Sequence, residues 1–386
     1  MKMLVLFGGT FPYGSAISSR VLNYCRLFRS LGYDVHVIAL RSKESKYSTS
    51  TAYRFETFSF QIVTTKSTSS LDSFIGSKEL IRSTKAYIEG HKVDAFFLVS
   101  FEPYFRKMIG RLKKTGAPIY IDQCEWMDVS SYRLRYIDWR YIRRNWLINK
   151  GYKKVDGVVS ISRLLNQHFC DLGVRTVRVP TILDVENASY TETVTNKKIN
   201  IVYSGNPSHS KEYLKPMIQL LAENETFRER FRFEICGPSE QKVIANIGGD
   251  RKLLDKAGDS VVIRGMVPQE KMPKLLQNAW FQLFIRPNRR SSNAGFPTKL
   301  GESMMNGTPV ITNDTGDISL YLQDGVNGFL LDDNSIDALR NTLERVLTLS
   351  SDEYKQMRIS ARRTAEESFD YRRYISQISN LFRQEE

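Results

Sequence analysis

The chain has 386 residues, of which 41% are hydrophobic and 25% charged, a composition that provides ordinary globular cores for about two domains. No run of about 18 apolar residues occurs, so we expect no transmembrane helix. The apolar start at residues 1–6 is too short for a signal peptide. The four cysteines show no metal-ligand spacing, so we expect reduced thiols, no metal site and a cytoplasmic protein.

The net charge of +14 is unevenly distributed along the chain. Residues 1–185 hold 29 Lys and Arg against 15 Asp and Glu, whereas residues 186–386 hold 27 of each kind. Excess charge in one half favours an anionic partner for that half, such as a nucleic acid, an acidic membrane or a phosphorylated acceptor. General solubility explains the same excess equally well.

The N-terminal half predicts a parallel α/β domain. The apolar run 3–7 predicts a first strand that enters a loop at Gly8 and Gly9, and the spacing at 17–31 predicts a helix before a second strand at 34–40. This βαβ unit lacks a G-x-G-x-x-G fingerprint, so a dinucleotide site is weakly supported. We interpret the polar residues 42–56 as a loop. Further helices are predicted at 77–90, 105–114 and 163–172, and further strands at 94–100, 118–122, 155–162 and 176–180.

Polar residues 123–128 follow the predicted strand 118–122. Because ligands of doubly wound sheets bind beyond the carboxyl ends of the strands, we select Glu125 as a candidate catalytic residue. Its alternative role is a loop carboxylate paired with one of the many nearby arginines.

Residues 131–154 form the most basic and aromatic part of the chain, in which eight Lys and Arg interleave with six Tyr and Trp. The pattern fits an interfacial helix docked on anionic lipid. It equally fits a helix that covers the sheet with snorkelling arginines. No recognisable nucleic-acid module is present, so we expect no nucleic-acid partner.

The C-terminal half predicts a second parallel domain after a polar linker at 184–198. Strands are predicted at 199–205, 231–236, 261–265, 279–285 and 309–312, and helices at 298–305, 335–349 and 351–382. Its central feature is residues 291–312. Pro297 suits a first helical turn, Asn306 and Gly307 stop the helix, and a buried strand follows.

This loop–helix–strand stretch suits a sugar nucleotide. A helix N-terminus is an anion site, to which the backbone near Gly295 and the charge of Lys299 can contribute. Glu302 lies one turn further along the same helix. A carboxylate there repels a phosphate but accepts two hydrogen bonds from a ribose diol. A plain helix–turn–strand unit is the alternative interpretation.

Residues 294–310 resemble the signature of the retaining GT-B glycosyltransferases of family four, in which two Glu separated by seven residues precede a small-residue helix and Gly-x-Pro-Val. The second Glu is Glu302, and Ala294 stands in place of the first. The resemblance implies that Glu302 binds the donor ribose, while the donor sugar lacks its usual carboxylate.

Other motifs carry the same resemblance. Relatives have Gly-Arg and then Lys after the first strand of the second domain, where this chain has Asn206 and Lys211, so one cation of the diphosphate clamp is missing. The backbone of Met266 stands where relatives recognise the base. Many relatives carry a His near Cys124 or Glu125. The implied donor-binding residues are Gly9, Asn206, Lys211, Met266, Gly295, Phe296, Pro297, Thr298, Lys299 and Glu302.

From the resemblance we expect the α/β GT-B fold, with two Rossmann-like domains facing a cleft. Their expected bounds are residues 1–185 on the acceptor side and 198–365 on the nucleotide-sugar side, and residues 366–386 form a helix that crosses back to the N-domain. The expected enzyme is a retaining, metal-independent, hexosyltransferase-type glycosyltransferase. It needs no cofactor and uses a UDP- or GDP-linked sugar.

The expected acceptor is a glycan or lipid-linked precursor in cell-envelope polysaccharide biosynthesis. The protein would be peripheral at the inner face of an anionic membrane, with residues 131–154 as the contact. Two alternatives share the fold, namely a catalytically degenerate GT-B protein and a UDP-sugar epimerase. A third, a nucleotidyltransferase, is suggested by residues 9–11, but the His-x-Gly-His that it requires is missing.

Overall fold

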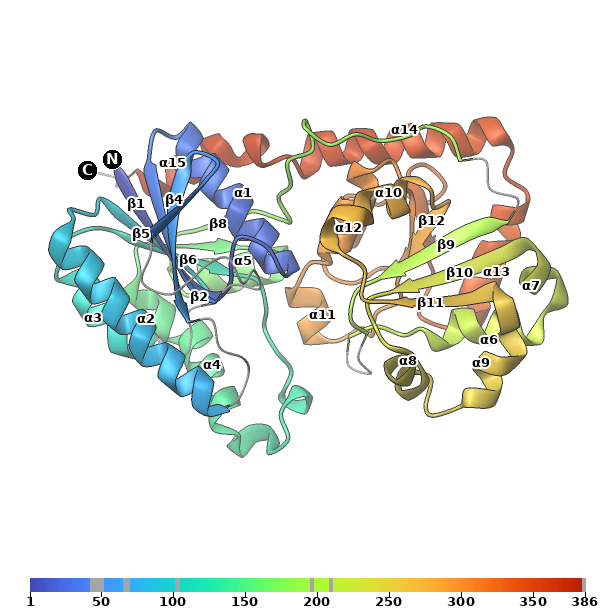
Figure 1. The fold of residues 1–386 in the computed structure, drawn as a ribbon, viewed down its shortest axis with the longest axis horizontal. Helices are drawn as coiled ribbons and strands as arrows, with labels where there is room; N and C mark the ends of the chain where they lie inside the picture. The colour runs from blue at the N-terminus through green and yellow to red at the C-terminus, as the bar shows by residue number, and fades with distance from the viewer. Residues whose placement is uncertain (42–51, 65–69, 101–104, 195–197, 208–210, 384–386) are drawn as a thin grey trace. The chain divides into compact units, whose positions relative to one another are not determined.

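The computed structural model describes all residues except 42–51, 65–69, 101–104, 195–197, 208–210 and 384–386. The chain forms two compact units (Figure 1). The first unit contains Met1–Asp184 and Tyr371–Glu386, and the second contains Val185–Asp370. Each unit is an α/β layer structure built on a largely parallel sheet, as the sequence predicts.

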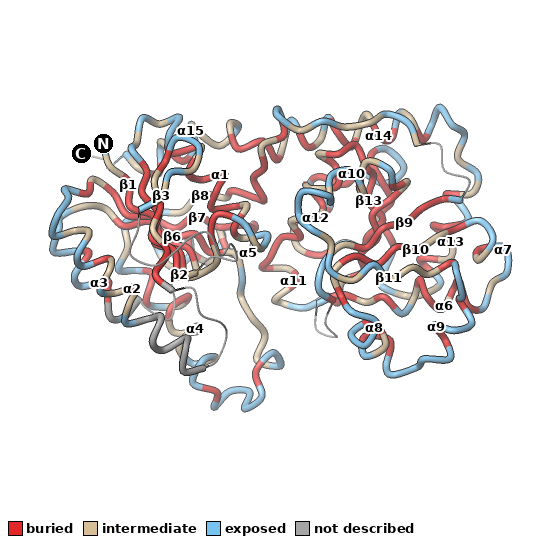
Figure 2. Tube along the Cα trace, in the orientation of Figure 1, coloured by how far each residue is buried: buried red, intermediate tan, exposed pale blue. Residues whose placement is uncertain are grey.

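The first unit contains an eight-stranded sheet with the order β3-β4-β2-β1-β5-β6-β7-β8. Its strands are β1 (Lys2–Thr10), β2 (Asp34–Arg41), β3 (Ala52–Phe55), β4 (Phe58–Thr64), β5 (Ala95–Val99), β6 (Ile119–Gln123), β7 (Gly157–Ser160) and β8 (Thr176–Arg178). All pairs are parallel except β3 with β4. The central strands are buried on both faces, which explains their unbroken apolar runs (Figure 2).

The edge of this sheet differs from the sequence prediction. Of the segment 42–56, interpreted as a loop, residues 42–51 lie outside the described part of the chain, whereas 52–55 form β3. The adjoining β4 was not predicted at all. The polar residues in β3 and β4 obscure the pattern of a buried strand, because an edge hairpin needs only one apolar face.

Two sets of helices cover the first sheet. Its helices are α1 (Ala16–Ser30), α2 (Ser70–Gly90), α3 (Phe105–Lys113), α4 (Trp139–Asn149), α5 (Arg163–Asp171) and α15 (Ile375–Phe382). The main core joins β1, β2 and β4 to α1 and α15. The Oγ of Ser15 caps α1 by accepting from the Ser18 amide at 3.2 Å. On the other face, His36 of β2 stacks on Tyr87 of α2 with ring centroids 4.3 Å apart.

The second unit contains a six-stranded parallel sheet with the order β11-β10-β9-β12-β13-β14. Its strands are β9 (Ile199–Ser204), β10 (Phe231–Cys236), β11 (Val261–Gly265), β12 (Phe281–Leu283), β13 (Val310–Asn313) and β14 (Gly328–Leu331). Its helices are α6 (Lys215–Glu223), α7 (Glu225–Arg230), α8 (Glu240–Asn246), α9 (Arg251–Ala257), α10 (Met272–Gln277), α11 (Arg290–Ala294), α12 (Thr298–Met305), α13 (Ile336–Leu347) and α14 (Ser351–Ser368).

The helix predicted at 351–382 is divided in the structure. A capping box of Ser350 and Glu353 starts α14, which ends at Ser368, and α15 follows in the first unit after a 3₁₀ turn. The end of the chain therefore belongs to the same unit as its beginning. The division falls after Asp184 and Asp370, whereas the expected boundaries were 185, 198 and 366.

Two arginines of α14 hold the segment that the sequence predicts as a linker. Arg358 is fully buried and donates to the carbonyl oxygens of Thr191 and Ala279 at 2.9 and 2.8 Å. Arg362 donates to the carbonyl oxygens of Val185 and Met305 at 2.8 and 2.7 Å. Residues 185–191 are thereby part of the second unit, and the end of α12 is fixed to α14.

Candidate functional site

The predicted loop–helix–strand stretch is present in the second unit as α11, α12 and β13. Pro297 precedes Thr298, the first residue of α12, and no side chain caps this helix end. Gly307 has a φ of 70°, and a Cβ on it would lie 2.9 Å from the Thr191 oxygen, so the turn requires glycine. The start of α12 retains the amide geometry that an anion can use.

Lys299 is held by side chains of its own unit. Its Nζ lies 2.6 Å from Oε2 of Glu212 and 4.4 Å from the centre of the Tyr203 ring. The hydroxyl of Tyr203 donates to the same Glu212 oxygen at 2.5 Å. Burial lowers the pKa of Lys299, and the Glu212 carboxylate opposes this effect. The ammonium is therefore positioned by a carboxylate and an aromatic face.

Gly205 leaves space for the Lys299 ammonium at the carboxyl end of β9. This residue follows β9 with a φ of 147°, and a Cβ on it would lie 3.0 Å from Nζ of Lys299. The backbone of the turn after β10 is also close to Gly205, because a Cβ on Gly237 would lie 2.0 Å from the Gly205 oxygen. Glycines thus allow the turns after β9 and β10 to approach each other, and Gly205 also leaves room for the Lys299 ammonium.

Glu302 lies on α12, one turn beyond Lys299, and is half-buried. Burial raises the pKa of its carboxyl group, and the Lys299 ammonium opposes this effect. The Asn306 side chain donates to the Glu302 backbone oxygen at 2.8 Å and thus fixes the end of the helix. Lys299 and Glu302 are therefore brought together as the sequence predicts.

The turn after β9 carries the remaining predicted cation. Lys211 is exposed and directly precedes the buried Glu212. Asn206 is exposed too, and its Oδ1 accepts from Nζ of Lys242 at 3.3 Å. Lys242, on α8, thus brings an ammonium to the residue that replaces the arginine of the family pattern.

The residues before α12 have more structural roles than expected. The Gly295 amide donates to the Ser291 oxygen at 3.2 Å, and its φ of −91° is open to any residue. The expected flexibility of Gly295 is therefore not used in this structure. The ring of Phe296 is buried against Tyr321 and Phe369 with centroids 5.4 and 5.8 Å away.

Ala294, which replaces the first Glu of the signature, is completely buried at the end of α11. Its methyl group belongs to the packed interior of the second unit. Met266, by contrast, is 81% exposed and follows Gly265, whose oxygen accepts from the Gly237 amide at 2.7 Å. Met266 therefore follows a turn that is bonded to the turn after β10.

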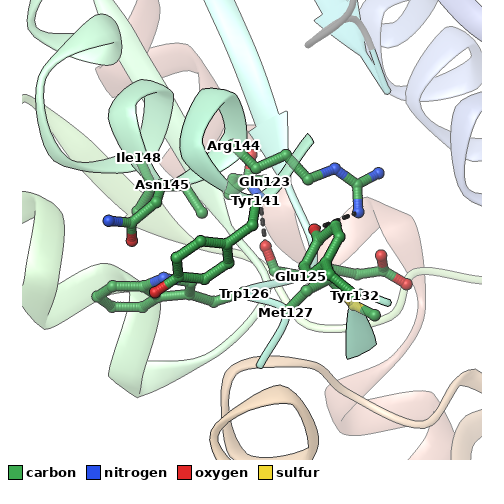
Figure 3. A pocket seen from close by; sticks show the side chains of 9 residues that line it. All are labelled: Gln123, Glu125, Trp126, Met127, Tyr132, Tyr141, Arg144, Asn145 and Ile148. Carbon is green, nitrogen blue, oxygen red and sulfur yellow. Dashed lines mark hydrogen bonds between the residues drawn. The ribbon is translucent and has the colours of Figure 1, made fainter. Parts of the chain in front are cut away.

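Gly9 and Glu125 belong to the first unit. A Cβ on Gly9 would lie 2.4 Å from the Phe7 ring, so this glycine is required by packing. Glu125 lines a pocket behind β6, together with Gln123, Trp126, Met127, Tyr132, Tyr141, Arg144, Asn145 and Ile148 (Figure 3). The pocket combines three aromatic rings with several polar groups, but its enclosed space is about that of one water molecule, so a sugar ring does not fit inside it in this structure.

A buried ionic network contains Asp122, which directly precedes the pocket residue Gln123 on β6. Arg20 and Asp122 form a buried ion pair at 2.9 Å, and the Tyr24 hydroxyl donates to the same carboxylate at 2.9 Å. The thiol of Cys124 donates to Asp122 at 3.0 Å, and burial, reinforced by Asp122, raises its pKa. Cys124 is thus a protonated structural group, and Glu125 is the acidic residue that reaches the pocket.

Sequence reasoning missed Glu212, Tyr203 and Lys242. The available signal was the position of Tyr203 near the end of a predicted strand and of Glu212 after the following turn. Among the described residues, no group of three His, Cys, Asp or Glu side chains is arranged to hold a metal ion. Within the same part of the chain, no helix has the length and apolar character needed to cross a membrane.

Residues 186–364, nearly the whole second unit, match the family model described as Glycosyl transferases group 1. No curated protein matches the chain. Among solved structures, it resembles sucrose-phosphate synthase from Thermosynechococcus elongatus, with 12% identity, a TM-score of 0.78 and coverage of 100% of this chain and 99% of that one.

Two further structures are similar over nearly their whole lengths. HepE from Anabaena, in complex with UDP and glucose, has 14% identity and a TM-score of 0.70, and 98% of each chain is covered. The lipopolysaccharide outer core galactosyltransferase WaaB has 16% identity and a TM-score of 0.64, and 99% of each chain is covered. The chain therefore has the GT-B fold, and residues 186–364 of its second unit match the Glycosyl transferases group 1 family.

Proposed function

We propose that this protein is a retaining, metal-independent glycosyltransferase of the hexosyltransferase type. Its donor is a UDP- or GDP-linked sugar bound by the second unit. The observation that carries the proposal is the pair of Lys299 and Glu302 on α12, within the domain that matches the family. The binding of UDP and glucose by HepE supports a nucleotide-sugar donor.

Each donor group has a proposed partner. Glu302 accepts hydrogen bonds from the ribose diol, and each such charge-assisted bond contributes about 1.5–3 kcal/mol. Lys299 and Lys211, with the first amides of α12 at Thr298, receive the diphosphate. The backbone of Met266 contacts the base, while Gly295, Phe296 and Pro297 shape the loop.

The proposed reaction breaks the bond between the anomeric carbon and the diphosphate oxygen. The acceptor hydroxyl oxygen forms the new glycosidic bond on the same face, and its proton passes to the departing phosphate oxygen. The cations stabilise the negative charge that develops on the leaving group. The chemistry requires no paired carboxylates, and we assign Glu125 to the acceptor rather than to proton transfer.

The proposed acceptor is a glycan or lipid-linked precursor of a cell-envelope polysaccharide, bound by the first unit. The exposed carboxylate of Glu125 and the aromatic rings beside it support a sugar-containing acceptor bound at the surface of this region. The basic charge of residues 1–185 supports an anionic one and a peripheral position at a membrane.

A panel of UDP- and GDP-sugars tests this proposal through donor hydrolysis, with Glu302→Ala and Lys299→Ala as site variants. We expect one donor to be hydrolysed and each variant to lower kcat/KM by at least about tenfold. The exposed Lys274→Ala variant is the control and should behave as the unmodified protein. Equal hydrolysis by all three variants would place the site elsewhere.

The buried Ala294 supports one competing function, a degenerate protein that binds the nucleotide sugar without turnover. Calorimetric titration with the same donors separates the two. Donor binding without hydrolysis or transfer to any glycan acceptor would favour the degenerate protein. Conversion of the donor to an epimer would favour a UDP-sugar epimerase.

A further inference from the structure

The segment that enters α4 presents large apolar side chains to solvent. Within the described part of the chain, eleven large hydrophobic side chains are exposed, and five of them lie in residues 134–142. They are Leu134, Tyr136, Ile137, Trp139 and Ile142, with exposed fractions from 53% to 76%. We call residues 129–142 the apolar tip. Figure 2 shows the segment leading into α4 as mostly exposed.

The apolar tip is hydrogen-bonded within itself. Two 3₁₀ turns, Val129–Ser131 and Arg135–Ile137, join it to α4, and the Asp138 side chain caps α4 at the Arg140 amide at 3.0 Å. The amide of Ile137 donates to Leu134 at 3.2 Å. A segment that enters an apolar medium must satisfy its backbone groups internally, and these bonds satisfy part of them.

Arginines surround the apolar side chains. Arg133 and Arg135 are exposed, and the side chain of Arg140 is 52% exposed while it pairs with Asp138. The guanidinium of Arg143 lies 4.6 Å from the centre of the Trp139 ring. Asp138 is the one acidic residue in 129–142, so the tip has a net positive charge.

The inner side of the same segment is anchored in the pocket of the first unit. Tyr132 is 8% exposed and lines this pocket together with Tyr141 (Figure 3). Their ring centroids are 5.6 Å apart, and Tyr141 also contacts the exposed Tyr136 at 5.8 Å. The apolar tip and the pocket are therefore two sides of one element.

We propose that the apolar tip docks on an anionic lipid bilayer. Tyr and Trp favour the bilayer interface, Ile137 and Leu134 enter the acyl boundary, and the arginines contact anionic headgroups. The exposed aliphatic side chains cannot form hydrogen bonds with phosphates or base edges, so they suit an acyl layer better than a nucleic acid. The surplus of arginine opposes a symmetric contact between two copies of the tip.

The inference deepens the proposed function and rests on it in one respect, since a lipid-linked acceptor would meet the pocket when the tip is docked. It also restricts the membrane contact, which the sequence predicts at residues 131–154, to the apolar tip. The C-terminal half of that range is packed, with Leu147, Ile148 and Tyr152 buried, so docking falls to the tip.

Vesicle sedimentation of the full chain tests the inference, with phosphatidylcholine alone and with phosphatidylglycerol added. We expect binding to the anionic vesicles and little to the neutral ones. The double variants Ile137→Ser/Trp139→Ser and Arg133→Glu/Arg135→Glu should each weaken binding by about tenfold or more. All four side chains are exposed, so the fold should survive, as a melting curve would verify.

Matched controls separate the tip from general charge. Lys113→Glu/Lys114→Glu makes the same charge change at another exposed site of the first unit, and Leu164→Ser removes another exposed apolar side chain. Both should bind within about threefold of the unmodified protein. Equal losses in controls and tip variants, or no preference for anionic vesicles, would overturn the inference.

Two further measurements close the test. Donor hydrolysis in solution should be the same in the tip variants as in the unmodified protein. If the unmodified protein hydrolyses no donor, that result counts against the proposed function and leaves lipid docking unaffected. Sedimentation equilibrium should give the same mass for all variants. A dimer that the tip variants dissociate would show that a second copy of the chain covers this surface, and would overturn lipid docking.

Discussion

Nζ of Lys299 lies 2.6 Å from Oε2 of Glu212, and both side chains are nearly buried, at 13% and 11% exposure. Tyr203 donates to the same carboxylate and also places its ring beside the ammonium. The cation proposed for the donor diphosphate therefore already has an internal anion as its partner.

Removing the cation alone should destabilise the second unit. Lys299→Met leaves Glu212 as a buried, uncompensated carboxylate, so we expect a loss of about 3–5 kcal/mol in the free energy of unfolding. The double variant Glu212→Gln/Lys299→Met should recover most of it. Denaturant titration measures both. Lys85→Met, which breaks the exposed pair with Glu89, is the control and should cost less than about 1 kcal/mol. Additive losses in the double variant would contradict this coupling.

Glu302 should show a conflict between function and stability. Burial raises its pKa in the folded protein above the ordinary value of 4.5, so folding is favoured by its protonated form. That contribution is present below pH 4.5 and is lost as the pH rises through the folded pKa. Glu302→Gln should therefore raise the melting temperature at pH 7 and have no effect below pH 4.5.

The same change should weaken donor binding at pH 7, because a neutral amide binds the ribose diol less tightly than a carboxylate. Calorimetric titration with the donor and melting curves across pH measure the two effects. Glu367→Gln, at an exposed position on α14, is the control for loss of one charge. A lower melting temperature for Glu302→Gln at pH 7 would disprove the predicted sign.

Restoring the family residue at position 294 should not restore a sugar contact. Ala294 is completely buried, so Ala294→Glu places a carboxylate in a packed interior and should cost several kcal/mol of stability, on the order of 3–5. Ala294→Ser is the small control and should cost about 1–2 kcal/mol. An Ala294→Glu protein that is stable and more active would show that this position faces the donor.

The buried network of the first unit should be sensitive to charge. Asp122→Asn removes the anion that compensates Arg20, and we expect a loss of about 3–5 kcal/mol in unfolding free energy. Tyr24→Phe removes one hydrogen bond from the same carboxylate and should cost only about 1–2 kcal/mol. Denaturant titration compares them, and similar losses would show that packing dominates over charge.

The parts of the fold that follow from local pattern were predictable. Buried parallel strands give continuous apolar runs, so the strands at 3–7, 34–40 and 199–205 were predicted correctly. Pro297 at the start and Gly307 after the end predicted the helix α12. The edge hairpin β3–β4 and the break after Ser368 were not predicted, because the hairpin lacks an unbroken apolar run and no Gly or Pro stands at the end of α14.

The candidate site was predictable where a motif spans one element. Lys299 and Glu302 are three residues apart on a helix, so sequence alone brings them together. Glu212 is 87 residues from Lys299, and only the packing of the turn after β9 against α12 pairs them. The burial of Ala294 likewise depends on the surrounding chain rather than on its neighbours in sequence.

The Glu212 carboxylate also has a consequence for the turnover that we propose. An ammonium that draws a nucleoside diphosphate into place would ordinarily retain it after the sugar has left. Here the Glu212 carboxylate of the same protein competes with the diphosphate for the Lys299 ammonium. If Lys299 binds the diphosphate as we propose, return of its ammonium to Glu212 would favour release of the spent nucleotide over its retention.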